Sequence, residues 1–155
     1  MNIIGIIAEY NPFHNGHLYH INKIKELYPN SLLILVTSGY FTQRGHISVL
    51  DKENKTKIAL DNNIDIVLEL PFIYSTQSSD IFAYQSIKIL NELNIDTLVF
   101  GSESNDINFL KDIVEKQNSP EYEQRVKEYL SEGINYPTAM SKALNLDHNI
   151  TTPND

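Results

Sequence analysis

The chain lacks cysteine altogether, although it is 155 residues long. Disulfide bonds and thiolate metal sites are therefore excluded. A protein without disulfides fits a reducing compartment, so we expect a cytoplasmic location. The length is sufficient for one domain with its own core and short for two, so we expect a single domain.

Basic residues are also scarce. Lysine and arginine together number 12, against 20 aspartate and glutamate residues, which gives a net charge of −8. Proteins whose main task is to hold nucleic acid usually present a basic surface, because contacts to phosphates supply most of their affinity. The composition excludes such a broad surface here. Any contact with RNA must be local or must come from sequence outside this chain.

Long apolar runs are missing as well. No stretch approaches the roughly 20 apolar residues that a membrane-spanning helix needs, so we expect no membrane partner. Residues 1–8 are largely apolar, but they contain no basic leader and Glu9 follows them directly. They predict a buried strand rather than a signal peptide.

Strand and helix patterns alternate along the sequence. Apolar, often β-branched runs predict strands covered on both faces at residues 2–8, 31–37, 64–70 and 97–100. Helical spacing of apolar residues predicts helices at about residues 16–27, 51–60, 78–93, 106–118, 120–132 and 138–146. The alternation is typical of a Rossmann-like α/β fold, in which helices cover both faces of a parallel sheet, followed here by short C-terminal helices. The predicted apolar face of the third helix consists of Ala83, Ile87, Leu90 and Leu93.

The edge formed by the carboxyl ends of the strands is the expected ligand site, because ligands bind there in such sheets. Residues 9–17 follow the first predicted strand and residues 101–103 follow the fourth. Residues 38–50 follow the second strand as a polar loop punctuated by glycine, and loops of this length are usually functional. The segments 9–17 and 101–103 are therefore expected to lie at the same edge of the sheet, in the geometry of a nucleotide site.

Three of the five histidines lie within seven positions, at 14, 17 and 20. His14 and His17 are three residues apart at the start of the first predicted helix, so both side chains lie on one face. The unpaired N–H groups of a helix N-terminus suit an anion, and Gly16 allows close approach of the backbone. The pattern predicts a phosphate site that stabilises charge during in-line attack.

Two other interpretations of these histidines stay open. In a metal site, His14, His17 and His20 would have to converge, but the side chains rotate by about 100° per residue and suit tetrahedral zinc poorly. We therefore predict no metal site. In the other interpretation the histidines only cap and pack the helix. A similar choice exists for Glu69 and Asp80, which form either a carboxylate pair or, separately, an ion pair and a helix cap.

The segment "GIIAEYNPFHNGHLYHI", residues 5–21, resembles the signature of the HxGH nucleotidyltransferase superfamily, with His14-Asn15-Gly16-His17 as the signature itself. Three later segments extend the likeness in the same order: "SGYFTQRG", "DIVLELPFIYSTQSSDIFA" and "LVFGSES". Together they resemble a narrower family, the tRNA(Met) cytidine acetate ligases. The resemblance implies that residues 1–155 are an N-terminal nucleotidyltransferase-like domain that binds ATP and lacks the C-terminal region of the family.

The activity that the resemblance implies has two steps. ATP first activates acetate as acetyl-adenylate, and the acetyl group then passes to the wobble cytidine of elongator tRNA(Met), forming N4-acetylcytidine. The exocyclic amine of cytosine is a weak nucleophile, so acetate must be activated beforehand. Neither step needs a covalent protein nucleophile, which fits the absence of cysteine and of a serine elbow. ATP is the implied co-substrate, and the sequence identifies no ligands for an accompanying Mg²⁺ ion.

The resemblance also implies roles for particular residues. His14 and His17 would be the catalytic residues, and both would contact the phosphates. The implied ATP-binding residues are Ile7, Ala8, Glu9, Tyr10, Asn11, Pro12, Phe13, His14, Asn15, Gly16, His17, Leu18, Tyr19, His20, Gly101 and Asn154. A plain turn at Gly101 and a disordered end at Asn154 are the alternatives.

A small basic group, Gln43, Arg44 and Lys52, could contact acetate or tRNA, although a solvated loop and helix face would also explain it. Two further functions stay open besides the ligase. One is an adenylyltransferase for another acceptor, such as a phosphorylated cofactor precursor. The other is a non-catalytic module that binds a nucleotide or tRNA.

Overall fold

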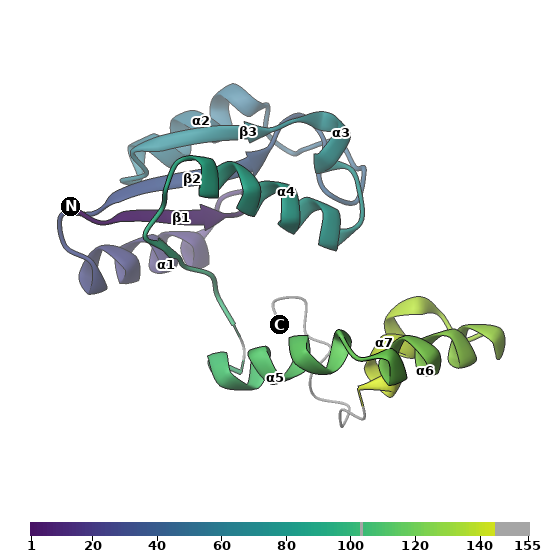
Figure 1. Cartoon of the computed structure of the whole chain (residues 1–155). Helices are drawn as coiled ribbons and strands as arrows, with labels where there is room; N and C mark the ends of the chain where they lie inside the picture. The colour runs from purple at the N-terminus through teal and green to yellow at the C-terminus, as the bar shows by residue number, and fades with distance from the viewer. Residues whose placement is uncertain (103, 145–155) are drawn as a thin grey trace. The chain divides into compact units, whose positions relative to one another are not determined.

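The computed structural model describes residues 1–102 and 104–144. The chain divides into two compact units, Met1–Phe100 and Gly101–Asp155 (Figure 1). The first unit contains the sheet and the histidine motif, and the second is helical where it is described.

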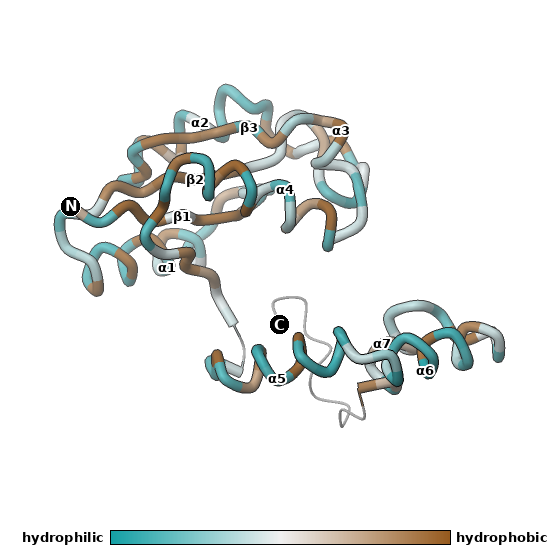
Figure 2. Tube along the Cα trace, viewed as in Figure 1, coloured by the Kyte–Doolittle hydropathy of each residue, from teal (hydrophilic) through white to brown (hydrophobic). Residues whose placement is uncertain are grey.

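A four-stranded parallel sheet forms the centre of the first unit. Its strands are β1 (Ile3–Ile7), β2 (Leu32–Ser38), β3 (Ile66–Leu70) and β4 (Thr97–Leu98), in the order β3-β2-β1-β4. Every neighbouring pair is parallel. The predicted α/β fold class is confirmed, although β4 has two residues where residues 97–100 were predicted. Figure 2 shows the apolar character of the strands, which is expected for a sheet covered on both faces.

Helices cover both faces of this sheet. The helices α1 (Asn15–Leu27) and α2 (Lys52–Asp61) share one hydrophobic core with β1 and β2, which includes Ile21 and Ala59. The helix α4 (Ser79–Glu92) packs on the opposite face through Phe82 and Leu90. Asp51 caps α2 as its position predicts, because its Oδ1 accepts the Asn54 N–H at 2.7 Å.

The chain reverses after β3 through a single helical turn, α3 (Phe72–Ser75), which begins directly after Pro71. This helix is not predictable from the sequence, because four residues are too few to show a helical period. The turn lies beyond the end of β3, at the same end of the sheet as the loop that follows β2 (Figure 1).

The predicted apolar face of α4 is confirmed at Leu90, whereas Ala83, Ile87 and Leu93 are exposed. Phe82, Ser86 and Leu90 are buried, whereas Ile87 is 46% exposed and Leu93 is 40% exposed. The buried positions follow a spacing of four residues, and a serine occupies the middle one. Because this buried residue is polar, the spacing of apolar residues alone does not identify the packed face.

The second unit consists of α5 (Ile107–Gln117), α6 (Pro120–Ser131) and α7 (Tyr136–Ala143). Its core is small and joins α6 to α7 through Val126, Ala139 and Ala143. Gly133 follows the C-cap of α6 with a φ of +83°, a left-handed conformation that suits glycine at the end of a helix. The last positions of the predicted helix 138–146 lie outside the described residues. No helix in the described part of the chain is long and apolar enough to cross a membrane.

Replacement of Leu90 by Ala tests the packed face of α4. Leu90 is fully buried against the sheet, so we expect Leu90→Ala to lower the free energy of unfolding by about 2–5 kcal/mol in urea denaturation. The control is Ile87→Ala on the exposed side of the same helix, which should change it by no more than about 0.5 kcal/mol. Equal losses in the two variants would contradict the observed packing.

Candidate functional site

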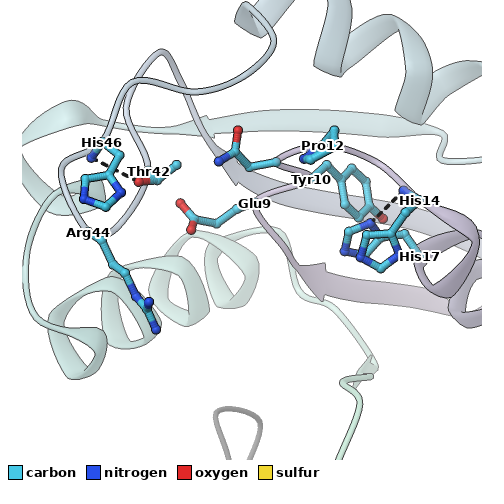
Figure 3. A pocket seen from close by; sticks show the side chains of 9 residues that line it. Glu9, Tyr10, Pro12, His14, His17, Thr42, Arg44 and His46 are labelled. Carbon is cyan, nitrogen blue, oxygen red and sulfur yellow. Dashed lines mark hydrogen bonds between the residues drawn. The ribbon is translucent and has the colours of Figure 1, made fainter.

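A cavity of about 400 Å³ lies at the carboxyl end of β1, where the chain enters α1. Figure 3 shows that two segments supply its walls, the turn between β1 and α1 and the loop that follows β2. The residues that line it are Glu9, Tyr10, Asn11, Pro12, His14, His17, Thr42, Arg44 and His46.

His14 and His17 cap α1 reciprocally. The His14 Nδ1 atom accepts the Gly16 N–H at 3.1 Å, and the His17 Nδ1 atom accepts the His14 N–H at 3.2 Å. Two histidines thus occupy the positions of a capping box, which is usually built from serine or threonine and glutamate. The two rings stack with their centroids 3.8 Å apart. The predicted capping role of these residues is therefore real, and it uses only one nitrogen of each ring.

The capping bonds fix where hydrogen sits on each neutral imidazole. A ring nitrogen that accepts an N–H cannot itself carry hydrogen, so Nδ1 is bare and Nε2 carries the proton in both rings. Burial, with smaller contributions from the neighbouring histidines, lowers the pKa of His17 to about 4. His17 is therefore neutral at pH 7 and presents an Nε2–H donor without a positive charge.

Gly16 and two aromatic rings hold these imidazoles in place. A side-chain carbon on Gly16 would lie 2.9 Å from Cε1 of His14, so only glycine leaves room for the ring that caps its N–H. Tyr10 and Phe13 support His17 from the other side, with ring centroids 4.7 and 5.6 Å from the imidazole. The Tyr10 side chain is 2% exposed, and its hydroxyl has no hydrogen-bond partner among the described residues.

Glu9 and Asn11 attach the loop after β2 to this turn. The Glu9 Oε1 atom accepts the Ser38 hydroxyl at 2.9 Å and the Gln43 N–H at 2.7 Å. The Asn11 Oδ1 atom accepts the Ser48 hydroxyl at 3.1 Å and the Val49 N–H at 2.7 Å. Because both ends of the loop are held, Thr42, Arg44 and His46 lie across the cavity from the histidines (Figure 3).

The tip of this loop is a tight turn that carries Arg44. The Gly45 N–H donates to the Thr42 carbonyl at 2.8 Å, and the His46 N–H donates to the Thr42 hydroxyl at 3.2 Å. Gly45 has a φ of +76°, a conformation that glycine adopts without strain. Arg44 and His46 are exposed at this tip and line the cavity, so the guanidinium cation of Arg44 shares the cavity with the two imidazoles.

Lysines 52 and 55 serve different parts of the structure. The buried Lys55 donates to the carbonyls of Ser38 and Gly39 at 2.7 and 2.8 Å, and so holds the start of the loop. Lys52 pairs with Glu69 at 2.8 Å and lines a separate cavity between β2, β3 and α2. Lys52 and Arg44 therefore line two different cavities, and Glu69 forms an ion pair with Lys52.

Of the sequence-predicted ATP-binding residues, six line the cavity. The other members of the segment do not appear in its lining: Ile7, Ala8, Phe13, Asn15, Gly16, Leu18, Tyr19 and His20. Gly101 is exposed at the start of the second unit, and Asn154 lies outside the described residues. Gln43 contributes its backbone N–H to Glu9, while its side chain donates to the Gln77 carbonyl at 2.5 Å.

Thr42 and His46 also line the cavity, although the sequence alone does not assign them to the site. The length of the loop was the available signal, but only the fold shows that these residues face the histidines. Within the described residues, no group of three histidine, cysteine or acidic side chains is arranged to hold a metal ion. Asp80 lies in the first turn of α4, apart from the ion pair of Glu69.

A family model described as HIGH Nucleotidyl Transferase matches residues 1–155. The chain belongs to this family. In this HIGH nucleotidyl transferase, the four-residue motif is His14-Asn15-Gly16-His17. Asn15, the second residue of the motif, is exposed. The cap and the ring contacts described above involve the other three residues, His14, Gly16 and His17.

Similar proteins support the narrower resemblance. The chain is 52% identical to a tRNA(Met) cytidine acetate ligase of Fusobacterium nucleatum over 92% of its own length and 36% of that protein. It is 49% identical to one of Mycoplasma mobile, over 98% of the chain and 52% of the relative. The structure of Thermotoga maritima TmcAL bound with alpha-thio ATP matches with a TM-score of 0.84 and 42% identity, over 93% of the chain and 36% of that protein. The chain thus spans between a third and about half of these relatives.

A pair of substitutions at His14 tests whether this residue caps α1. Loss of the side-chain acceptor in His14→Ala should lower the free energy of unfolding by about 1 kcal/mol in urea denaturation. Asparagine is a favoured N-cap residue, so His14→Asn should recover most of this loss. If the two variants were equally destabilised, the observed cap would not contribute to stability.

Proposed function

We propose that this HIGH nucleotidyl transferase activates acetate with ATP as part of a tRNA(Met) cytidine acetate ligase. The observation that carries the proposal is the pair of imidazoles whose Nε2–H groups remain for a ligand at the start of α1. Donors of this kind, together with the positive end of a helix, suit phosphate oxygens. The activities, substrates and partners of the longer relatives are part of this proposal.

The phosphates of ATP would bind at His14 and His17. As acetate attacks the α-phosphorus, negative charge increases on the phosphate oxygens and pyrophosphate departs. Fixed Nε2–H donors stabilise that charge without having to reorganise. The binding of alpha-thio ATP by the similar Thermotoga maritima protein supports ATP as the nucleotide.

Acetate would bind at the opposite wall, beside Arg44. A guanidinium group matches a carboxylate in charge and geometry, and the cavity brings Arg44 to the same space as the imidazoles. Glu9 is the acidic residue in the lining, so it is the carboxylate that a Mg²⁺ ion carried by ATP would meet there. Gln43 and Lys52 have other partners in the structure, which favours Arg44 over them as the acetate contact.

The second step would transfer the acetyl group to RNA. The exocyclic N4 of cytidine attacks the acetyl carbon, the bond to the phosphate oxygen breaks, and AMP leaves while the amine loses a proton. The names of the similar proteins support elongator tRNA(Met) as the acceptor and a ligase reaction that produces AMP and pyrophosphate. An adenylyltransferase for another acceptor and a non-catalytic nucleotide-binding module are the alternatives that the experiment must separate.

His14→Asn and His17→Gln test the phosphate site without removing the cap. Asparagine caps a helix, and glutamine at the third helical position can bond back to the N-cap backbone, so both variants should stay folded. Each variant replaces one ring-held imidazole Nε2–H donor by an amide whose oxygen takes over the cap and whose N–H groups do not occupy the position of the imidazole donor. We expect at least tenfold weaker ATP binding in calorimetry, and unchanged binding in the control Asn22→Ala on the exposed side of α1.

Release of pyrophosphate then distinguishes the acceptors. The proposal predicts that acetate stimulates pyrophosphate release from ATP more than longer carboxylates or phosphorylated acceptors do. A preference for another acceptor would indicate the different adenylyltransferase. ATP binding without turnover on any acceptor would indicate the non-catalytic module. Unchanged ATP affinity in both histidine variants would contradict the phosphate site itself.

A further inference from the structure

Exposed apolar side chains gather beside the cavity, on the loop after β2 and on α3. The members of this aromatic patch are Tyr40, Phe41, Ile47, Phe72 and Ile73, which are 47%, 37%, 78%, 58% and 62% exposed, respectively. Large apolar groups that are exposed together usually mark a binding surface. The patch is therefore a feature that the ATP site does not explain.

Direct contacts hold the two segments of the patch together. The rings of Phe41 and Phe72 meet edge to face with centroids 5.4 Å apart. Phe41 and Ile47 form an antiparallel bridge across the loop. The Gln43 side chain joins the loop to the residues that follow α3 through the Gln77 carbonyl. The aromatic rings thus have a fixed arrangement before any partner binds.

The charge of the patch differs from that of the whole chain. Residues 39–49 and 71–78 contain one charged side chain at pH 7, the cation Arg44, although the net charge of the chain is −8. Lys52 lies 5.1 Å from the ring centre of Tyr40, but it is paired with Glu69, and the Tyr40 hydroxyl donates to Glu53. The positive charge that a polyanion would meet beside the aromatic rings is therefore that of Arg44. Exposed aromatic rings with nearby cations are the usual platform for unpaired bases.

We propose that the aromatic patch stacks unpaired bases of an RNA acceptor beside the ATP site. The inference rests on the proposed function, because that function makes RNA the acceptor. The same loop supplies Thr42, Arg44 and His46 to the cavity, so a base stacked on Phe41 and Phe72 lies next to the activated acyl group. The patch positions the target nucleotide, and the cavity performs the chemistry.

Replacement of Phe72 by Ala tests this platform. The probe is an anticodon stem–loop RNA with cytidine at the wobble position, and its binding to the chain is measured by fluorescence anisotropy at fixed salt concentration. Loss of one stacking ring should weaken RNA binding at least tenfold in Phe72→Ala. ATP affinity should stay unchanged in this variant. Tyr84→Ala is the matched control, since Tyr84 is a 64% exposed ring on α4 outside the patch, and it should bind RNA normally.

Other results would overturn the inference. If the wild-type chain bound ATP but not this RNA, the proposed role of the aromatic patch would be contradicted and the proposed ATP site would remain supported. Equal RNA affinity in Phe72→Ala and the wild type would do the same. A tenfold loss of ATP affinity in Phe72→Ala would assign the rings to adenine. Unchanged RNA binding together with a shift from dimer to monomer in sedimentation would assign them to a second copy of the chain.

The failure of the proposed function is distinguishable from the failure of this inference. Loss of RNA binding in Phe72→Ala with no ATP binding in any variant would support the platform and reject the proposed function.

Discussion

The reciprocal hydrogen bonds between His14 and His17 determine the chemistry of the site. In each ring, Nδ1 accepts a backbone N–H at the start of α1, so the hydrogen of the neutral ring lies on Nε2. Gly16 is required because a side chain there would collide with the His14 ring. Helix capping and ligand binding are thus two uses of the same pair of rings. The first use prepares the second, because it fixes the rings before a ligand arrives.

The cavity exists because two distant segments are joined by buried polar contacts. Glu9 and Asn11 accept hydrogen bonds from the loop after β2, and Lys55 holds the first carbonyls of that loop. These contacts place Arg44 opposite the histidines. An acidic protein thereby presents a local site for anions without a basic surface. The same loop carries Phe41, so the arrangement of the aromatic patch depends on the same contacts.

Part of this structure could be predicted from the sequence. Continuous apolar runs indicated the parallel sheet, and the three-residue spacing of His14 and His17 indicated an anion site at its edge. Other features depend on contacts between distant residues. The roles of Thr42 and His46 follow from hydrogen bonds that span more than thirty residues, as between Glu9 and Gln43. The buried face of α4 includes Ser86, which no apolar pattern reveals. The tautomers of the histidines also required the cap geometry.

Nitrogen NMR of the two imidazoles tests the central claim most directly. The account predicts that in the free protein Nδ1 of both rings is bare and accepts a backbone N–H, with hydrogen on Nε2, and that His17 is neutral at pH 7. Addition of ATP should then change the Nε2 resonances of both rings and leave the Nδ1 resonances nearly constant. Hydrogen on Nδ1 in either ring, or Nε2 resonances that ATP leaves unchanged, would contradict the account.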